Sequence, residues 1–232
     1  GAFSLLQRIT DNQMDKPVGS VTYTQMLNEK GGIECDLSVS RIGEDHFYLV
    51  MGTAFIKHDL SWIQKHLPDD RSVTVNDVTS SKACITLCGP QARNILKQLT
   101  RDDISNPGFP YMTCKQIILG YTPVLALRIT YVGELGWELH MPMEHALYVY
   151  DAIWEAGKSF GLANVGYRCI ESLRLEKGYR YWSGDISPEY TPFEAGLDFC
   201  VKLNKGEFIG RQALLSQKEK GITRRLCCLI IH

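Results

Sequence analysis

The sequence contains no hydrophobic run long enough to cross a membrane. Its longest apolar stretches, such as residues 226–231, are far shorter than the roughly 20 residues that a spanning helix requires. An excess of charge is missing as well, because 25 Lys and Arg residues face 26 Asp and Glu residues. A balanced chain has no general field that favours nucleic acid or an anionic lipid surface. We therefore expect neither nucleic acid nor a membrane among its partners.

The motifs of several enzyme classes are also absent. There is no GxGxxG after a strand, no GxxxxGK[ST], no HExxH and no GxSxG. The chain has eight cysteines but no CxxC pair with a matching cluster, and none of its six histidines has a metal-ligand spacing. We therefore expect free thiols in a reducing compartment and no metal site.

What the sequence does contain is a mixture of antiparallel hairpins and helices. This mixture predicts an α+β fold in which helices cover antiparallel sheets. Strands are expected at residues 21–27, 33–40, 47–51, 73–78, 83–87, 124–130 and 137–141, and helices at 3–9, 56–67, 90–99, 143–160 and 165–177. The 232 residues can form one large domain or two smaller ones. A division is expected in the loop at residues 106–110, which gives subdomains 1–108 and 109–232.

The first candidate site residue is Asp36, on the second strand of the expected hairpin. Alternation places Ile33, Cys35 and Leu37 on one face of that strand, and Glu34 and Asp36 on the other. From this strand alone, a solvated polar face is the simpler interpretation, since carboxylates are mostly exposed.

A second candidate is the segment 131–138, where two glycines permit a tight hairpin loop. Such a loop is expected to bring Tyr131 and Glu138 near each other. An aromatic face beside a carboxylate suits a flat heterocycle with several N–H donors, because a carboxylate accepts two of them together. An ordinary hairpin with a wet Tyr and Glu explains the pattern equally well.

The third candidate is Arg174, which follows Glu171 by three residues on an expected helix. The pair is typical of a surface ion pair on a helix. The alternative is an arginine that binds an anionic ligand such as a carboxylate tail.

Five short segments occur in an order that resembles the folate-binding family of the glycine-cleavage aminomethyltransferase. They are residues 23–37, 87–90, 131–138, 172–178 and 208–211. Within this family, residues 132–138, 173–180 and 194–197 most resemble the folate domain of sarcosine and dimethylglycine dehydrogenases. The resemblance covers nearly the whole chain. The small C-terminal barrel of the family is expected to be missing after Leu226, and the strand-like run 224–232 suggests a piece of a longer chain.

The resemblance implies a role for each candidate residue. Asp36 resembles the catalytic carboxylate of the family, which orients the folate and takes a proton, and Tyr23 lines the same site. Tyr131 is expected to contact the pteridine, and Glu138 to accept hydrogen bonds from its amino-substituted edge. Arg174 is expected to face the glutamyl tail.

The implied function is transfer of a one-carbon unit from an amine-derived iminium to tetrahydrofolate. In the dehydrogenases, an upstream FAD domain oxidises the N-methyl amine, and we expect these 232 residues not to include that domain. Two other functions remain open: a glycine-cleavage aminomethyltransferase, which needs a lipoyl carrier protein, and a regulatory subunit like that of pyruvate dehydrogenase phosphatase. The expected compartment is the mitochondrial matrix in a eukaryote and the cytoplasm in a bacterium.

Overall fold

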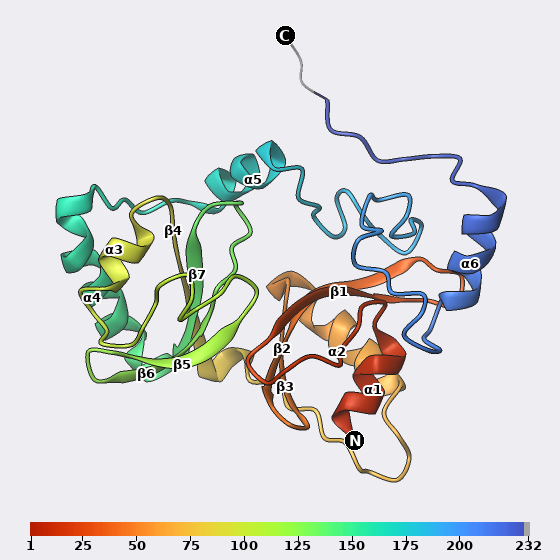
Figure 1. Ribbon diagram of the computed structural model, residues 1–232, viewed down its shortest axis with the longest axis horizontal. Coiled ribbons are helices and arrows are strands. Elements are labelled where there is room, and N and C mark those ends of the chain that lie inside the picture. The colour runs from red at the N-terminus through yellow and green to blue at the C-terminus, as the bar shows by residue number, and fades with distance from the viewer. Residues whose placement is uncertain (230–232) are drawn as a thin grey trace. The chain divides into compact units, whose positions relative to one another are not determined.

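The computed structural model describes residues 1–229, which divide into two compact units. The first unit contains Gly1–Asn76 and the chain from Arg180 onward, and the second contains Asp77–Tyr179. Each unit has its own antiparallel sheet with accompanying helices (Figure 1). The predicted α+β class is therefore confirmed. No helix among the described residues is both long and apolar enough to span a membrane.

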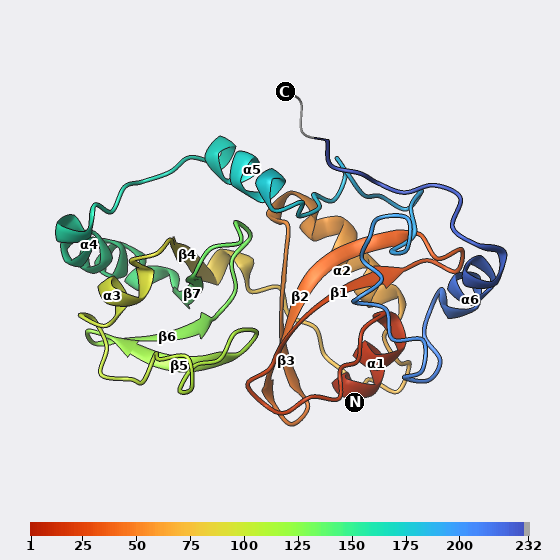
Figure 2. The same cartoon turned by 45° about the horizontal axis from the view of Figure 1, so that its top comes forward.

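The first unit is built on a sheet with the strand order β1-β2-β3, all antiparallel. The strands are β1 (Val21–Leu27), β2 (Ile33–Gly43) and β3 (His46–Met51). The helices are α1 (Ala2–Ile9), α2 (Ile56–Lys65), which follows a 3-10 turn at Thr53–Phe55, and α6 (Arg211–Lys220). Helix α2 contacts β2, and α1 contacts β3 (Figure 2).

The turn between β1 and β2 explains why this hairpin forms. The Asn28 Oδ1 atom accepts hydrogen bonds from the backbone N–H groups of Lys30 and Gly32, each at 3.0 Å. Gly31 has φ +83°, a conformation that glycine adopts without steric cost. A Cβ atom on Gly32 would lie 1.9 Å from the Pro188 carbonyl oxygen. Glycine is therefore required at position 31 by the backbone conformation and at position 32 by the lack of space for a side chain.

Alternation along β2 assigns the faces of Cys35 and Leu37 as predicted, but Ile33 packs in a separate cluster with Leu27, because the register of the hairpin shifts between Met26 and Leu27. Cys35, Leu37 and Val39 are at most 2% exposed and pack with Ile63 of α2 and Ile9 of α1. The opposite face carries Asp36, and the register of the hairpin places Gln25 of β1 beside it.

The second unit is a four-stranded antiparallel sheet in the order β4-β7-β6-β5. The strands are β4 (Lys82–Cys88), β5 (Cys114–Leu119), β6 (Thr122–Leu127) and β7 (Gly136–Pro142). The helices are α3 (Ala92–Leu96), α4 (Ala146–Gly157) and α5 (Tyr167–Glu176), with 3-10 turns at Thr79–Ser81, Met143–His145 and Lys158–Phe160.

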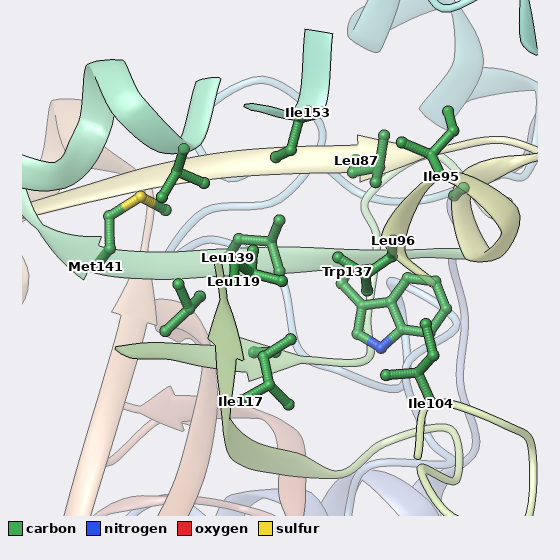
Figure 3. Packing of buried hydrophobic residues seen from close by; sticks show 14 of the residues in the cluster. Leu87, Ile95, Leu96, Ile104, Ile117, Leu119, Trp137, Leu139, Met141 and Ile153 are labelled. Carbon is green, nitrogen blue, oxygen red and sulfur yellow. The ribbon is translucent and has the colours of Figure 1, made fainter. Parts of the chain in front are cut away.

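One face of this sheet forms the core of the second unit, together with α3 and α4. Figure 3 shows Trp137, Leu139 and Met141 of β7 within this cluster. All three are fully buried. Because side chains alternate along a strand, Glu138 and His140 must lie on the opposite face of β7.

The expected division at 108/109 is not where the units separate. Ile104 and Phe109 are 2% and 1% exposed and belong to the same cluster as Trp137. The chain on both sides of the expected boundary thus shares one core. The units separate instead at residues 76/77 and 179/180.

Several predicted elements differ from the structure. Residues 73–78 form no strand, although Val73 and Val75 pack against the core of the first unit. Neither β5 nor α6 was predicted from the sequence. Helix α6 has almost no apolar stripe, because Leu214 is its single buried residue. The predicted terminal strand has no regular structure over residues 224–229, and its last three residues lie outside the described range.

Candidate functional site

Asp36 lies at the centre of a polar network in the first unit. The register of the hairpin places Gln25 of β1 directly opposite it. The Gln25 Nε2 atom donates a hydrogen bond to Asp36 Oδ1 at 2.9 Å. Tyr23, two residues before Gln25 on the same face of β1, donates a further hydrogen bond to the carboxyl group through its hydroxyl. Two neutral donors thus fix the orientation of this carboxylate.

The surroundings also tune the acidity of Asp36. Burial raises its pKa to about 6, while the hydrogen bonds from Gln25 and Tyr23 act in the opposite direction. The negative charge of Asp59 adds a further upward contribution. A carboxyl group with this pKa can exchange a proton close to neutral pH, as a general base must.

Tyr23 is well placed to remain a donor. Its ring stacks on Phe199, with centroids 6.4 Å apart and an interplanar angle of 28°. Burial, followed by the charge of Asp36, raises its pKa well above the ordinary value. The hydroxyl therefore stays protonated and keeps its hydrogen bond to Asp36.

A second buried carboxylate, Asp11, supports the same network. Its Oδ1 atom accepts hydrogen bonds from Thr24 Oγ1 at 2.8 Å and from the Gln25 backbone N–H at 3.0 Å. Gln25 therefore links the two aspartates, through its backbone to Asp11 and through its side chain to Asp36. Burial raises the pKa of Asp11 to about 6, and it lowers the pKa of nearby Lys205 to about 8.

Sequence reasoning missed Gln25 and Asp11. A signal for Gln25 was present, because a hairpin turn at residues 28–32 places a residue of the first strand across from Asp36. No comparable local signal existed for Asp11, which reaches β1 from the segment after α1.

Tyr131 lies in the second unit, in the connection between β6 and β7. It is 37% exposed, and its ring stacks on Tyr179 with centroids 6.2 Å apart and an interplanar angle of 23°. Gly133, with φ +68°, turns the chain at the tip of this loop. The loop thus carries a partly exposed aromatic ring that stacks on Tyr179.

Glu138 lies on β7 and pairs with Leu127 and Thr86 on the neighbouring strands. It is half-buried, and its Oε2 atom is 3.4 Å from His140 Nε2. Because β6 ends at Leu127, the connection to β7 is longer than the tight loop predicted from the sequence. Tyr131 stacks on the ring of Tyr179, whereas Glu138 lies beside the imidazole of His140.

Arg174 on α5 is buried, with only 4% of its surface exposed. Its guanidinium forms an ion pair with Glu171, as the spacing predicted, and its Nη1 atom donates to the Tyr179 carbonyl oxygen at 2.9 Å. Burial makes this pair different from the expected surface ion pair. The arginine ties the end of α5 to the chain that follows it.

An open pocket of about 240 Å³ lies beside the loop that carries Tyr131. Its lining residues are Tyr111, Arg128, Ile129, Thr130, Glu134, Leu135 and Gly136. None of the five predicted site residues lines it, and its volume is below the roughly 300 Å³ at which ligand pockets begin. The five residues divide instead between the units: Tyr23 and Asp36 meet in the first, and Tyr131, Glu138 and Arg174 lie in the second.

Comparison with known proteins gives a family match over most of the chain. Residues 1–205 match the family described as the GCVT N-terminal domain. The chain is 42% identical to mitochondrial sarcosine dehydrogenase of Homo sapiens, over 94% of this chain and 26% of that protein. It is 38% identical to the mitochondrial pyruvate dehydrogenase phosphatase regulatory subunit of Mus musculus, over 99% of this chain and 26% of that protein. The chain therefore spans about a quarter of the length of these two relatives.

A bacterial relative and a solved structure agree with this match. An aminomethyltransferase of Thermoanaerobacter sp. (strain X514) is 36% identical over 97% of this chain and 61% of that protein. The crystal structure of glycine cleavage system aminomethyltransferase T from Bartonella henselae superposes with a TM-score of 0.78 at 24% identity, over 94% of this chain and 58% of that one. The likeness to this structure shows the fold, and the match over residues 1–205 shows that the chain belongs to the GCVT N-terminal domain family, the folate-binding family that its ordered segments resemble.

Proposed function

We propose that this chain binds tetrahydrofolate and transfers to it a one-carbon unit from an iminium derived from an N-methyl amine. In this proposal it acts as the folate domain of a sarcosine or dimethylglycine dehydrogenase-type enzyme. The observation that supports it most is the Asp36 carboxylate, oriented by Tyr23 and Gln25 in a member of this family.

The residues of this chain suit the chemistry of a reduced pterin. A partly exposed aromatic ring, Tyr131, offers a flat face to a heterocycle. The half-buried carboxylate of Glu138 accepts N–H donors, which the amino-substituted edge of a pterin supplies. Arg174 suits the glutamyl tail less well, because its guanidinium already binds Glu171 and the Tyr179 carbonyl. The neutral Ile170 lies one turn earlier on α5, so we expect the tail to be held weakly.

Bound tetrahydrofolate would supply the amine nitrogen to which the one-carbon unit is joined. Asp36 would accept the proton that this nitrogen loses as the new C–N bond forms, while the π electrons of the iminium pass to the donor nitrogen. Asp36 would then return the proton to the donor amine, which leaves as its own bond to the one-carbon unit breaks. The hydrogen bonds from Tyr23 and Gln25 would stabilise the Asp36 carboxylate before the transfer and keep it aimed at the site.

Oxidation of the amine is assigned to an FAD-containing domain, upstream in such an enzyme. This chain corresponds to 26% of sarcosine dehydrogenase, so most of such a protein would lie outside it. In a eukaryote, the mitochondrial matrix is the proposed compartment, since the named mammalian relatives are mitochondrial. In a bacterium it would be the cytoplasm.

The test compares binding with catalysis. We expect calorimetry to show that the wild-type protein and Asp36→Asn bind tetrahydrofolate with similar affinity. The rate of methylene-tetrahydrofolate formation above the spontaneous background should fall about 100-fold or more in Asp36→Asn, within the range for loss of a general base. Asp69→Asn, at an exposed position of the same unit, is the matched control and should change neither quantity.

A folded wild-type protein that releases no heat with tetrahydrofolate would contradict the proposal. It would then favour the regulatory alternative, suggested by the 38% identity to the phosphatase regulatory subunit. Transfer that proceeds only from an aminomethyl group on a lipoyl carrier protein would favour the glycine-cleavage alternative.

A further inference from the structure

Three potential metal ligands gather on one face of the sheet in the second unit. Cys84 of β4 and His140 of β7 are directly opposite each other in the antiparallel ladder. Glu138 lies two residues before His140 and therefore points to the same face of β7. The Sγ, Nε2 and carboxylate oxygen atoms of the three side chains all lie within 4.8 Å of one another.

The two distances from His140 to the other ligand atoms match those in a zinc site, and the third, between Cys84 and Glu138, is within 4.8 Å. The His140 Nε2 atom is 3.7 Å from Cys84 Sγ and 3.4 Å from Glu138 Oε2. For a tetrahedral ion with Zn–S of about 2.3 Å and Zn–N and Zn–O of about 2.1 Å, the N···S and N···O edges are about 3.6 and 3.4 Å. A good N–H···O hydrogen bond would be shorter, at about 2.9 Å.

The arrangement does not fit a nucleophilic triad. In a Cys-His-carboxylate triad, the thiol and the carboxylate bind opposite nitrogens of the imidazole ring. Here, Cys84 and Glu138 both approach the same nitrogen, Nε2 of His140. One ring nitrogen cannot serve both partners in that chemistry, but it can be one ligand of an ion that the other two also bind.

The charge and exposure of the three residues also suit a divalent cation. A thiolate and a carboxylate together neutralise the two positive charges of the ion, which limits the cost of holding it on a partly buried surface. His140 is only 6% exposed, whereas Cys84 is exposed and leaves a path by which an ion can enter.

A second group, Cys35, His58 and Asp59, has the same residue types but a different geometry. His58 Nδ1 and Asp59 Oδ1 are 2.9 Å apart, the length of an ordinary hydrogen bond, and the Cys35 thiol donates to Asp59. These side chains already satisfy one another, so the group needs no ion.

We propose that Cys84, Glu138 and His140 form a binding site for one divalent transition-metal ion of the zinc type, with an open fourth coordination position. Zinc sites with three protein ligands typically leave that position to water or a substrate. The proposal does not depend on the proposed folate chemistry, although both assign a role to the Glu138 carboxylate.

The experiment titrates the tag-free, chelator-treated 232-residue protein with Co²⁺ in the absence of folate, followed by Zn²⁺. We expect one equivalent of Co²⁺ to produce a thiolate-to-cobalt charge-transfer band together with the visible absorption of a four-coordinate ion. Zn²⁺ should then abolish both signals. In Cys84→Ser the charge-transfer band should disappear, and in His140→Gln the affinity for Co²⁺ should fall tenfold or more.

Cys169→Ser is the matched control, because it removes an exposed thiol from the same unit, and its spectrum should equal that of the wild type. Absence of the charge-transfer band in the folded wild-type protein would overturn the proposal without any variant. An unchanged band in Cys84→Ser, or loss of the band in Cys169→Ser alone, would overturn it as well. Because no folate is present, failure here is distinct from failure of the proposed one-carbon transfer.

Discussion

Gln25 is the residue through which the structure controls Asp36. Its side-chain amide donates to Asp36, and its backbone N–H donates to Asp11. The side-chain Oε1 atom is buried and has no hydrogen-bond partner among residues 1–229, so the amide contributes as a donor rather than as an acceptor. A donor to a carboxylate favours its ionised form and lowers its pKa.

This role predicts how the reaction depends on pH. If Asp36 acts as the base, the rate should rise with pH around its pKa of about 6 and then level off. In Gln25→Leu, loss of the hydrogen bond destabilises the carboxylate, so the midpoint of the pH–rate profile should move upward by about 1 pH unit. The measurement is the transfer rate from pH 5 to pH 8.

Gln116→Leu is a suitable control, since this glutamine is exposed on β5 and should leave the midpoint unchanged. A midpoint in Gln25→Leu that stays in place or moves downward would mean that the hydrogen bond does not tune the catalytic group.

At the scale of elements, the β1–β2 hairpin is the unit on which the candidate site depends. Gln25 and Asp36 face each other only because the turn at residues 28–32 fixes the register. A slip of one residue would move every side chain of β2 to the other face. The packing of the turn is therefore as important to the site as the residues on the strands.

Gly32→Ala tests this dependence. Its Cβ atom would lie 1.9 Å from the Pro188 carbonyl oxygen, so the turn or the Pro188 segment must move. We expect a loss of about 1–3 kcal/mol in the free energy of unfolding, the usual cost of overpacking, measured by urea denaturation. Gly166→Ala is the matched control, because no atom lies within 4 Å of its added Cβ. Equal losses in both variants would show that the contact with Pro188 does not matter.

At the scale of the whole molecule, the residues of the second unit come, in sequence order, between the two segments that form the first unit. The second unit has an apolar core around Trp137 and Leu139. The first unit has two apolar clusters, one around Leu37 and Ile63 and another around Ile33 and Phe193. Separate cores predict that the units respond separately to damage.

Matched Leu→Ala variants test this independence. Leu139 is 0% exposed in the second unit, and Leu37 is 2% exposed in the first. Each substitution should cost about 2–5 kcal/mol in its own unit. Hydrogen-exchange mass spectrometry should show faster exchange over residues 77–179 in Leu139→Ala and over residues 1–76 in Leu37→Ala. Equal acceleration across both units in either variant would contradict the division.

The sequence by itself determined the features that depend on local periodicity and on family resemblance. The alternation of Cys35 and Leu37 correctly assigned the buried face of β2, because successive side chains of a strand point to opposite faces. It failed for Ile33, which is buried in a separate cluster with Leu27 beyond a register shift of the hairpin. The ordered segments correctly identified the family. Local patterns failed where packing decides, as at residues 73–78 and in α6, whose apolar stripe is nearly absent.

Only the tertiary structure decided which distant residues become neighbours. Cys84 and His140 are 56 residues apart, and the ladder between β4 and β7 makes them partners, which no ligand spacing in the sequence indicates. The tertiary structure alone likewise places Asp11 beside Gln25 and buries Arg174. Strand register and burial depend on the packing of whole sheets, so the site environments follow from contacts that a one-dimensional pattern does not contain.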